Sequence, residues 1–123
     1  MIIISPNHMG RRHPRLAAFL AALATLLLVL AACSAEGPVT VNVAVENFKF
    51  VPDPLTISVG DSVTWTNEDP VGHNVQAKDK SFRTVLFFPD DSATLTFDTA
   101  GTFPYFCGAH PEMVGTIVVE AAD

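Results

Sequence analysis

The amino-acid sequence predicts an all-β fold, a Greek-key antiparallel β-sandwich of about seven or eight strands formed by residues 39–123. Two observations support this prediction. Apolar residues alternate with polar residues at a period of two along most of this region, and no segment keeps the period of an amphipathic helix. Each alternating run is short and ends at proline, glycine, asparagine or aspartate, which favour turns. Short strands separated by such turns are typical of β-sandwiches.

The first half of the domain shows this alternation clearly. Phe48 and Phe50 continue the apolar face of a valine-rich run that opens the domain. Trp65 lies on the apolar face of a later run, and we expect it to fill the space between the two sheets. The expected strands span residues 39–45, 48–50, 55–59 and 62–66, with turns at residues 52–54 and 60–61.

The second half is less regular. Residues 78–91 show no clear period, and we expect Phe87 and Phe88 in this segment to fold back over the core rather than form a recognition patch. Pro104 cannot donate to a strand ladder, so it predicts an edge or bulged position. Phe103, Tyr105 and Cys107 share one face of their strand, which directs Cys107 inward. The expected strands span residues 73–77, 93–97, 102–107 and 114–120.

The N-terminal segment has the pattern of an export signal. Arg11, Arg12 and Arg15 precede an apolar run over residues 16–30, which is too short for a confident membrane span. The run leads into Cys33, and the sequence around this cysteine resembles the bacterial lipobox. We therefore expect a lipoprotein signal peptide at 1–32, a lipidated Cys33 with a short tether at 33–38, and the folded domain at 39–123. The alternative is an ordinary signal peptide with an incidental cysteine.

This interpretation places the mature protein outside the cytoplasm, in the periplasm or at the cell surface, attached to a bacterial membrane by its N-terminal lipid. Removal of the signal peptide leaves four cations against thirteen acidic residues, a net charge of −9. Such a surface argues against nucleic acid as a partner and favours a basic or dipolar redox protein. We expect the acidic residues of the loops to be solvated charge, including Glu68, Asp69, Asp90, Asp91 and Glu112.

One short stretch carries metal-ligand chemistry. Cys107, His110 and Met113 follow a strand at regular spacing, and His73 stands where a Pro/Gly loop re-enters an apolar strand. Together they offer one thiolate, two imidazoles and a weak axial thioether, the donor set of blue-copper electron-transfer sites. Structural zinc usually takes four strong donors instead. A disulfide between Cys33 and Cys107 would compete with this interpretation, but both cysteines already have expected roles.

Three stretches, residues 50–67, 72–75 and 100–115, resemble the cupredoxins, specifically the amicyanin, pseudoazurin and plastocyanin group. The resemblance implies one copper ion with His73, Cys107 and His110 as equatorial ligands and Met113 as the axial ligand. It also implies that hydrogen bonds from Asn74 tie the first histidine loop to the cysteine loop. Gly72 departs from the pattern, because many members have proline there.

We therefore expect a mononuclear type 1 copper protein that carries single electrons between transient redox partners and is not an enzyme. The electron would pass through the ring edge of His110, between Ala109 and Pro111, and a monomer is the default state. A copper-binding lipoprotein that handles or delivers the metal is the alternative. A metal-free structural module of the same fold is a third hypothesis, which the four donors disfavour.

Overall fold

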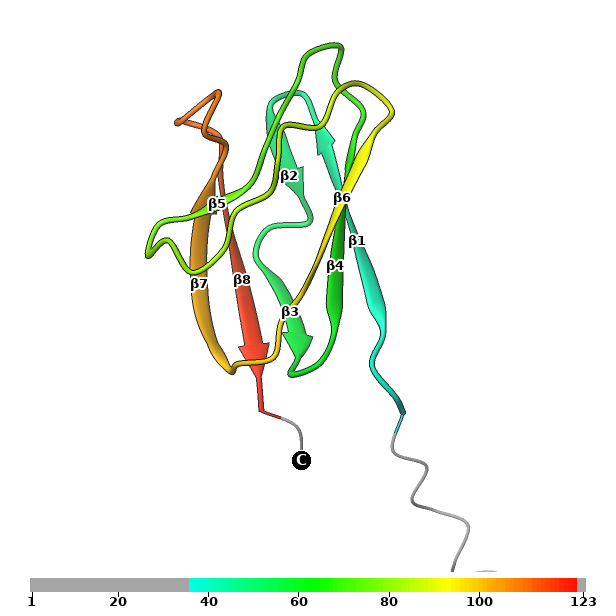
Figure 1. The fold of residues 1–123 in the computed structure, drawn as a ribbon, viewed down its shortest axis with the longest axis vertical. Coiled ribbons are helices and arrows are strands. Elements are labelled where there is room, and N and C mark those ends of the chain that lie inside the picture. The colour runs from blue at the N-terminus through cyan, green and yellow to red at the C-terminus, as the bar shows by residue number, and fades with distance from the viewer. Residues whose placement is uncertain (1–35, 122–123) are drawn as a thin grey trace, which may run out of the picture. The chain divides into compact units, whose positions relative to one another are not determined.

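The computed structural model describes residues 36–121, and these residues form the expected all-β sandwich (Figure 1). The predicted signal peptide and Cys33 lie outside the described residues. Nowhere in 36–121 is there a helix of the length and apolarity needed to cross a membrane. The strands are β1 (Thr40–Glu46), β2 (Lys49–Val51), β3 (Leu55–Ser58), β4 (Ser62–Asn67), β5 (Gln76–Ala77), β6 (Ser92–Thr96), β7 (Gly101–Phe106) and β8 (Val114–Glu120).

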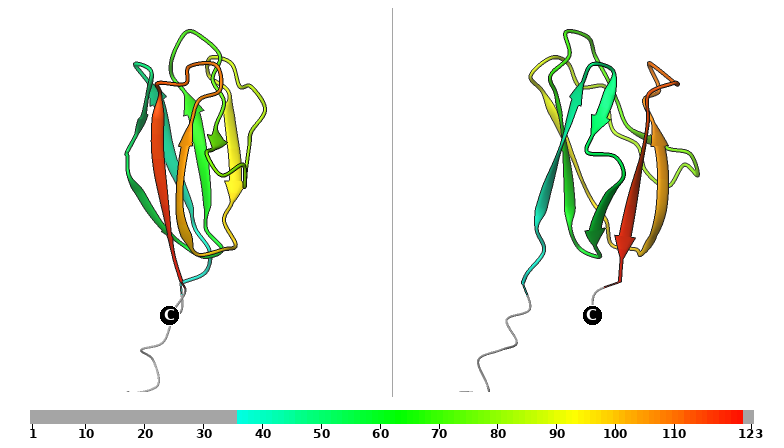
Figure 2. Two further views of the ribbon diagram at one scale, coloured as in Figure 1. Left: turned by 90° about the vertical axis from the view of Figure 1, so that its left-hand side faces the viewer. Right: turned by 180° about the vertical axis from the view of Figure 1, so that it is seen from behind.

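The strands form two four-stranded sheets, ordered β2-β1-β4-β6 and β3-β8-β7-β5, which face each other in the side views of Figure 2. The expectation of antiparallel sheets was too simple, because β1 pairs with β4 and β3 pairs with β8 in parallel. The chain leaves the first sheet to form β3 in the second sheet, and it returns as β4 in the direction of β1. A period of two is the same for parallel and antiparallel strands, so the alternation could not distinguish them.

The core lies between the sheets and consists of side chains from residues 43–119, so the domain contains a complete core of its own. Trp65 is fully buried, as expected, and its indole nitrogen donates a hydrogen bond of 3.3 Å to the Tyr105 hydroxyl across the core. Each fully buried aliphatic side chain contributes about 1.5–3 kcal/mol of transfer free energy. The core residues with no exposed surface include Val43, Val45, Val63, Val75 and Ile117.

Pro104 lies in β7, which is not an edge strand, but β5 ends before it reaches Pro104, so the expectation of an edge or bulged position is met in part. β7 is flanked by β8 and β5, and Pro104 lies opposite Thr116. The Pro104 carbonyl accepts a hydrogen bond of 2.9 Å from the Lys78 N–H, just beyond the end of β5. The missing N–H of the proline therefore falls where the two-residue strand β5 has already ended, so it costs the ladder little.

Loops from distant parts of the sequence gather at one end of the sandwich. These are the β1–β2 turn, the loop from β4 toward β5 and the loop between β7 and β8 (Figure 1). β1 begins and β8 ends at the opposite end of the domain. Segments about 34 residues apart in the chain, such as Asn74 and Gly108, meet at this end.

Candidate metal centre

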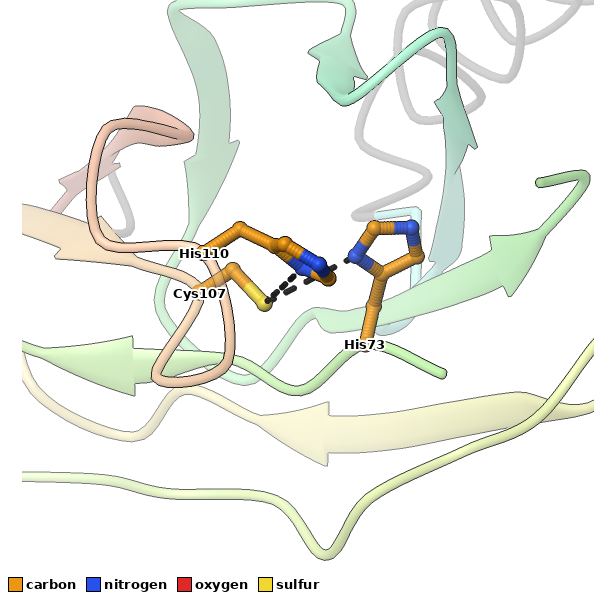
Figure 3. Close-up of side chains that lie close together, drawn as sticks. All are labelled: His73, Cys107 and His110. Atoms are coloured by element: carbon orange, nitrogen blue, oxygen red, sulfur yellow. Dashed lines mark hydrogen bonds between the residues drawn. The ribbon is translucent and has the colours of Figure 1, made fainter. Parts of the chain in front are cut away.

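His73, Cys107 and His110 converge at the loop end of the sandwich (Figure 3). The Cys107 Sγ lies 3.7 Å from the Nδ1 atoms of both histidines, and the three donor atoms all lie within 4.8 Å of one another. Bonds of about 2.3 Å to sulfur and about 2.0 Å to nitrogen, as zinc makes, would separate sulfur from nitrogen by about 3.7 Å at a trigonal angle of about 120°. The observed spacing therefore fits one ion between the three donors.

The β7–β8 loop carries two of these donors, Cys107 and His110, and its hydrogen bonds fix their positions in a compact turn. The Cys107 N–H donates to the Met113 carbonyl at 2.9 Å, the His110 N–H to the Cys107 carbonyl at 3.1 Å, and the Met113 N–H to the His110 carbonyl at 2.9 Å. Cys107 is fully buried, Met113 is almost fully buried, and His110 is half-buried at the rim. The loop thus leaves His110 as the one of these residues that reaches the surface.

His73 reaches the site from the loop that follows β4. Its side chain has no exposed surface, and its backbone pairs with Phe87 through two hydrogen bonds of 3.0 and 2.8 Å. These bonds fix the main chain beneath the imidazole. The ring therefore enters the site from the protein interior, whereas His110 closes the site from outside.

Asn74 connects the two ligand-bearing loops. Its side-chain oxygen accepts a hydrogen bond of 2.7 Å from the Gly108 N–H, and its backbone N–H donates to the Cys107 Sγ at 3.5 Å. An N–H directed at the sulfur stabilises negative charge on it. Asn74 therefore holds the cysteine loop against the His73 loop while its main chain contacts the thiol sulfur.

Asp69 is also part of the site, and the expectation that it is solvated charge was wrong. The side chain is buried, and its Oδ2 lies 2.9 Å from His73 Nε2. Burial alone would raise the pKa of Asp69, but hydrogen bonds from the Phe48 and Asn47 N–H groups and from His73 together hold this pKa below its ordinary value. Its position four residues before His73 in a Pro/Gly loop was the available sequence signal. Glu68, Asp90, Asp91 and Glu112 are exposed, as expected.

Phe48 is a second contact that the sequence did not reveal. Its ring packs edge-on against His73 and His110, with centroid separations of 5.6 and 5.1 Å. Alternation placed Phe48 on a strand face, whereas it lies in the β1–β2 turn and remains half exposed. With Ala109, Pro111, Glu112 and Met113 it lines an open depression beside His110.

Residues 18–119 match the family model described as a cupredoxin-like domain. The chain belongs to the cupredoxin family. Cupredoxins bind one copper ion, and this cupredoxin provides His73, Cys107 and His110 as candidate ligands. The thiolate and two imidazoles suit copper chemically, so the residues present fit the ion.

Individual proteins agree with this assignment. Amicyanin from Paracoccus versutus is 35% identical over 85 residues, which cover 65% of this chain and 64% of that protein. This cupredoxin therefore spans a little under two thirds of that relative's length. The solved structure of an amicyanin mutant in its Cu(I) form matches with a TM-score of 0.62 at 31% identity, over 66% of this chain and 82% of that chain.

A copper-containing nitrite reductase from Thermus scotoductus SA-01 also matches, with a TM-score of 0.65 at 28% identity. The match covers 75% of this chain but 25% of the reductase. Within residues 36–121 of this cupredoxin, His73, Cys107 and His110 form the one cluster of three or more histidine, cysteine or acidic side chains that could hold a metal ion.

The structure thus brings together His73, Cys107, His110 and Asn74 in this cupredoxin, with Met113 buried at the end of the same loop. Their individual ligand roles stay predictions. The two phenylalanines of the irregular segment separate: Phe87 packs into the core, as expected, whereas Phe88 is 57% exposed. Side chains alternate across an extended backbone, so two adjacent phenylalanines cannot both face the core.

Proposed function

We propose that this cupredoxin is a mononuclear type 1 copper protein that carries single electrons between redox partners outside the cytoplasm. The observation that supports this most directly is the spacing of the Cys107 sulfur, 3.7 Å from each of two histidine Nδ1 atoms, which fits a trigonal His₂Cys site. His73, Cys107 and His110 are the proposed equatorial ligands, and Met113 is the proposed axial ligand. Copper supplies the redox chemistry, since it alternates between Cu(I) and Cu(II).

The protein's contribution is to keep the same ligand positions in both charge states. The His73 main chain is fixed by its pairing with Phe87, and the Cys107 main chain is fixed by the turn that ends at Met113. Buried donors held in this way cannot rearrange freely when charge changes. Little nuclear reorganisation then opposes the electron, which is the requirement for fast transfer.

His110 is the proposed route for the electron. It is the surface-facing member of the ligand group, and exposed Ala109 and Pro111 flank it in the chain. This small apolar area suits brief docking of a redox protein. The strongly acidic composition of the mature chain favours a partner whose docking face is basic.

We propose further that residues 1–32 are a lipoprotein signal peptide and that lipid on Cys33 anchors the mature chain to a bacterial membrane. The domain suits such an anchor, because β1 begins at the end of the domain opposite the β7–β8 loop, which carries His110 (Figure 1). Membrane fractionation of cells that express the wild type or Cys33→Ser tests this proposal. Retention of the wild type in membranes and release of the variant is the expected result.

Copper handling or delivery is the second candidate function, favoured by the half-buried position of His110 beside an open depression. Such a protein would exchange its ion readily and need no reversible redox couple.

Visible spectroscopy of the copper-loaded protein during reductive titration separates the two candidates. An electron carrier shows an intense thiolate-to-copper band that bleaches and returns, and Cys107→Ser abolishes it. Tight copper binding without this band would reject the carrier function in favour of copper handling.

A further inference from the structure

The Asp69 carboxylate connects two segments that both contact the proposed copper ligands. Its Oδ2 lies 2.9 Å from His73 Nε2, and it also accepts hydrogen bonds from the N–H groups of Asn47 at 2.7 Å and Phe48 at 3.0 Å. Asp69 is 7% exposed, and within residues 36–121 its contact with His73 is the only one that pairs a carboxylate closely with a basic side chain. A buried carboxylate is costly unless it is well hydrogen-bonded. Its placement here therefore needs a structural or functional reason.

Toward His73, the carboxylate selects the imidazole tautomer. An ionised carboxylate only accepts hydrogen bonds, so the Nε2 atom of His73 carries the proton. Nδ1 then keeps its lone pair, and this atom faces the Cys107 sulfur at 3.7 Å (Figure 3). A ligand histidine needs this arrangement, with its second nitrogen hydrogen-bonded away from the metal.

Toward the β1–β2 turn, the same carboxylate stabilises a backbone conformation that is unfavourable for the residues there. Asn47 and Phe48 have φ angles of 52° and 57°, in the left-handed region. Asparagine tolerates this region, but phenylalanine does not, and glycine is the usual second residue of such a hairpin turn. Asp69 accepts the N–H groups of both residues. The strained position brings the Phe48 ring against both imidazoles, at centroid separations of 5.6 and 5.1 Å.

We propose that Asp69 is a positioning residue for the metal centre, which orients His73 through Nε2 and seats Phe48 as an aromatic cover over both histidines. The inference rests on the proposed copper site and adds to it a residue outside the ligand set. The negative charge next to His73 makes that imidazole a stronger donor and favours the more positively charged, oxidised centre. Asp69 therefore lowers the reduction potential and slows loss of the ion.

Asp69→Asn in the full-length protein tests the role toward His73, because it removes the charge while keeping the side-chain shape. In the metal-free protein, nitrogen NMR of the histidine rings is expected to show His73 as the Nε2–H tautomer in the wild type and as a mixture in the variant. In the copper-loaded variant, the equilibrium ratio of reduced to oxidised protein is expected to be at least about tenfold higher than in the wild type. This corresponds to a rise in reduction potential of at least about 59 mV for a one-electron couple.

Phe48→Gly tests the cover separately, since glycine keeps the turn and leaves the Asp69–His73 contact in place. A chelator is expected to remove copper several-fold faster from this variant, whereas the His73 tautomer stays as in the wild type. An unchanged removal rate would overturn the covering role.

Two matched controls isolate these effects. Asp61→Asn removes another buried aspartate that accepts two backbone N–H groups, from Val39 and Ser58, but touches no histidine. Asp91→Asn removes an exposed charge that accepts the Phe88 N–H. Both are expected to leave the tautomer unchanged and to shift the potential far less than Asp69→Asn.

The outcomes separate this inference from the proposed function. A wild-type His73 in the Nδ1–H tautomer overturns the positioning role even if Asp69→Asn does not fold, and so does a folded Asp69→Asn with wild-type tautomer and potential. A wild type that binds copper without a thiolate band rejects electron carriage, while the metal-free tautomer measurement still decides the role of Asp69.

Discussion

The side-chain oxygen of Asn74 lies 2.7 Å from the backbone nitrogen of Gly108 and accepts its hydrogen bond. This contact joins the loop that carries His73 to the loop that carries Cys107 and His110. Each loop is internally hydrogen-bonded, so their relative position depends on contacts of this kind. The Asn74 N–H also reaches the Cys107 sulfur, and the same residue therefore affects both loop position and thiolate charge.

Asn74→Ala is expected to lower the free energy of unfolding by about 1–3 kcal/mol, because the Gly108 N–H loses its acceptor in a partly buried place. Urea unfolding followed by fluorescence of Trp65, the one tryptophan of the chain, measures this change. Asn42→Ala, on the exposed face of β1, is the control and should stay within about 0.5 kcal/mol of wild type. Equal effects of the two substitutions would contradict the structural role of Asn74.

Two glycines near the site should respond differently to alanine. A Cβ at Gly115 would lie 2.5 Å from the ring of buried Tyr105, which cannot move because it fills the core. A Cβ at Gly108 would overlap the end of the flexible Gln76 side chain and lie 3.1 Å from the Asn74 Oδ1. Gly115→Ala should therefore cost about 1–3 kcal/mol or more, and Gly108→Ala clearly less.

Thermal unfolding of the copper-free variants compares these costs. Gly37→Ala, where a methyl group meets nothing within 4 Å, is the neutral control. A larger loss for Gly108→Ala than for Gly115→Ala would show that the Gln76 and Asn74 side chains cannot move aside.

The sequence was sufficient to predict the sandwich, the inward face of Cys107 and the convergence of His73 with Cys107 and His110. These features depend on the types of residue and on the period of the apolar residues, and both can be read from the sequence. It could not predict that Asp69 is buried, because Glu68-Asp69 in a loop looks the same whether it faces water or an imidazole. Nor could it predict the left-handed turn at Phe48, since that backbone is stabilised by a carboxylate 21 residues away. Both misses are contacts between loops, where periodicity carries no information.

Tyr105 should make the protein sensitive to alkali. Burial raises the pKa of Tyr105 well above its ordinary value, so the folded state keeps the phenol protonated when the unfolded state has lost its proton. The unfolded state then binds fewer protons, and stability falls as the pH rises above the unfolded pKa of about 10. Because the chain has one tyrosine, its absorbance near 295 nm should rise only as the protein unfolds.

Tyr105→Phe separates this linkage from general alkaline damage. The variant loses the acceptor for the Trp65 indole N–H and should be less stable at neutral pH by about 1 kcal/mol. Its stability should nevertheless decline less steeply above pH 10, so the two stability curves converge. Parallel curves would mean that Tyr105 ionises freely in the folded state.

Asp61 should make the protein less stable in acid, whereas Tyr105 makes it less stable in alkali. Hydrogen bonds from the Val39 and Ser58 N–H groups hold the pKa of Asp61 below its ordinary value, more than burial raises it. A lowered folded pKa adds stability that is fully present above the unfolded pKa of about 3.9 and is lost as the pH falls through the folded pKa. Asp61→Asn should therefore be less stable than wild type at pH 7 and approach it at low pH.

Urea midpoints across this pH range measure the difference in stability. Asp98→Asn, which removes an exposed carboxylate in the β6–β7 connection, is the control. If the difference in stability between Asp61→Asn and wild type does not change with pH, the Asp61 carboxylate has the same pKa in the folded and unfolded states. Asp61 would then stabilise the fold only through hydrogen bonds that do not depend on its charge.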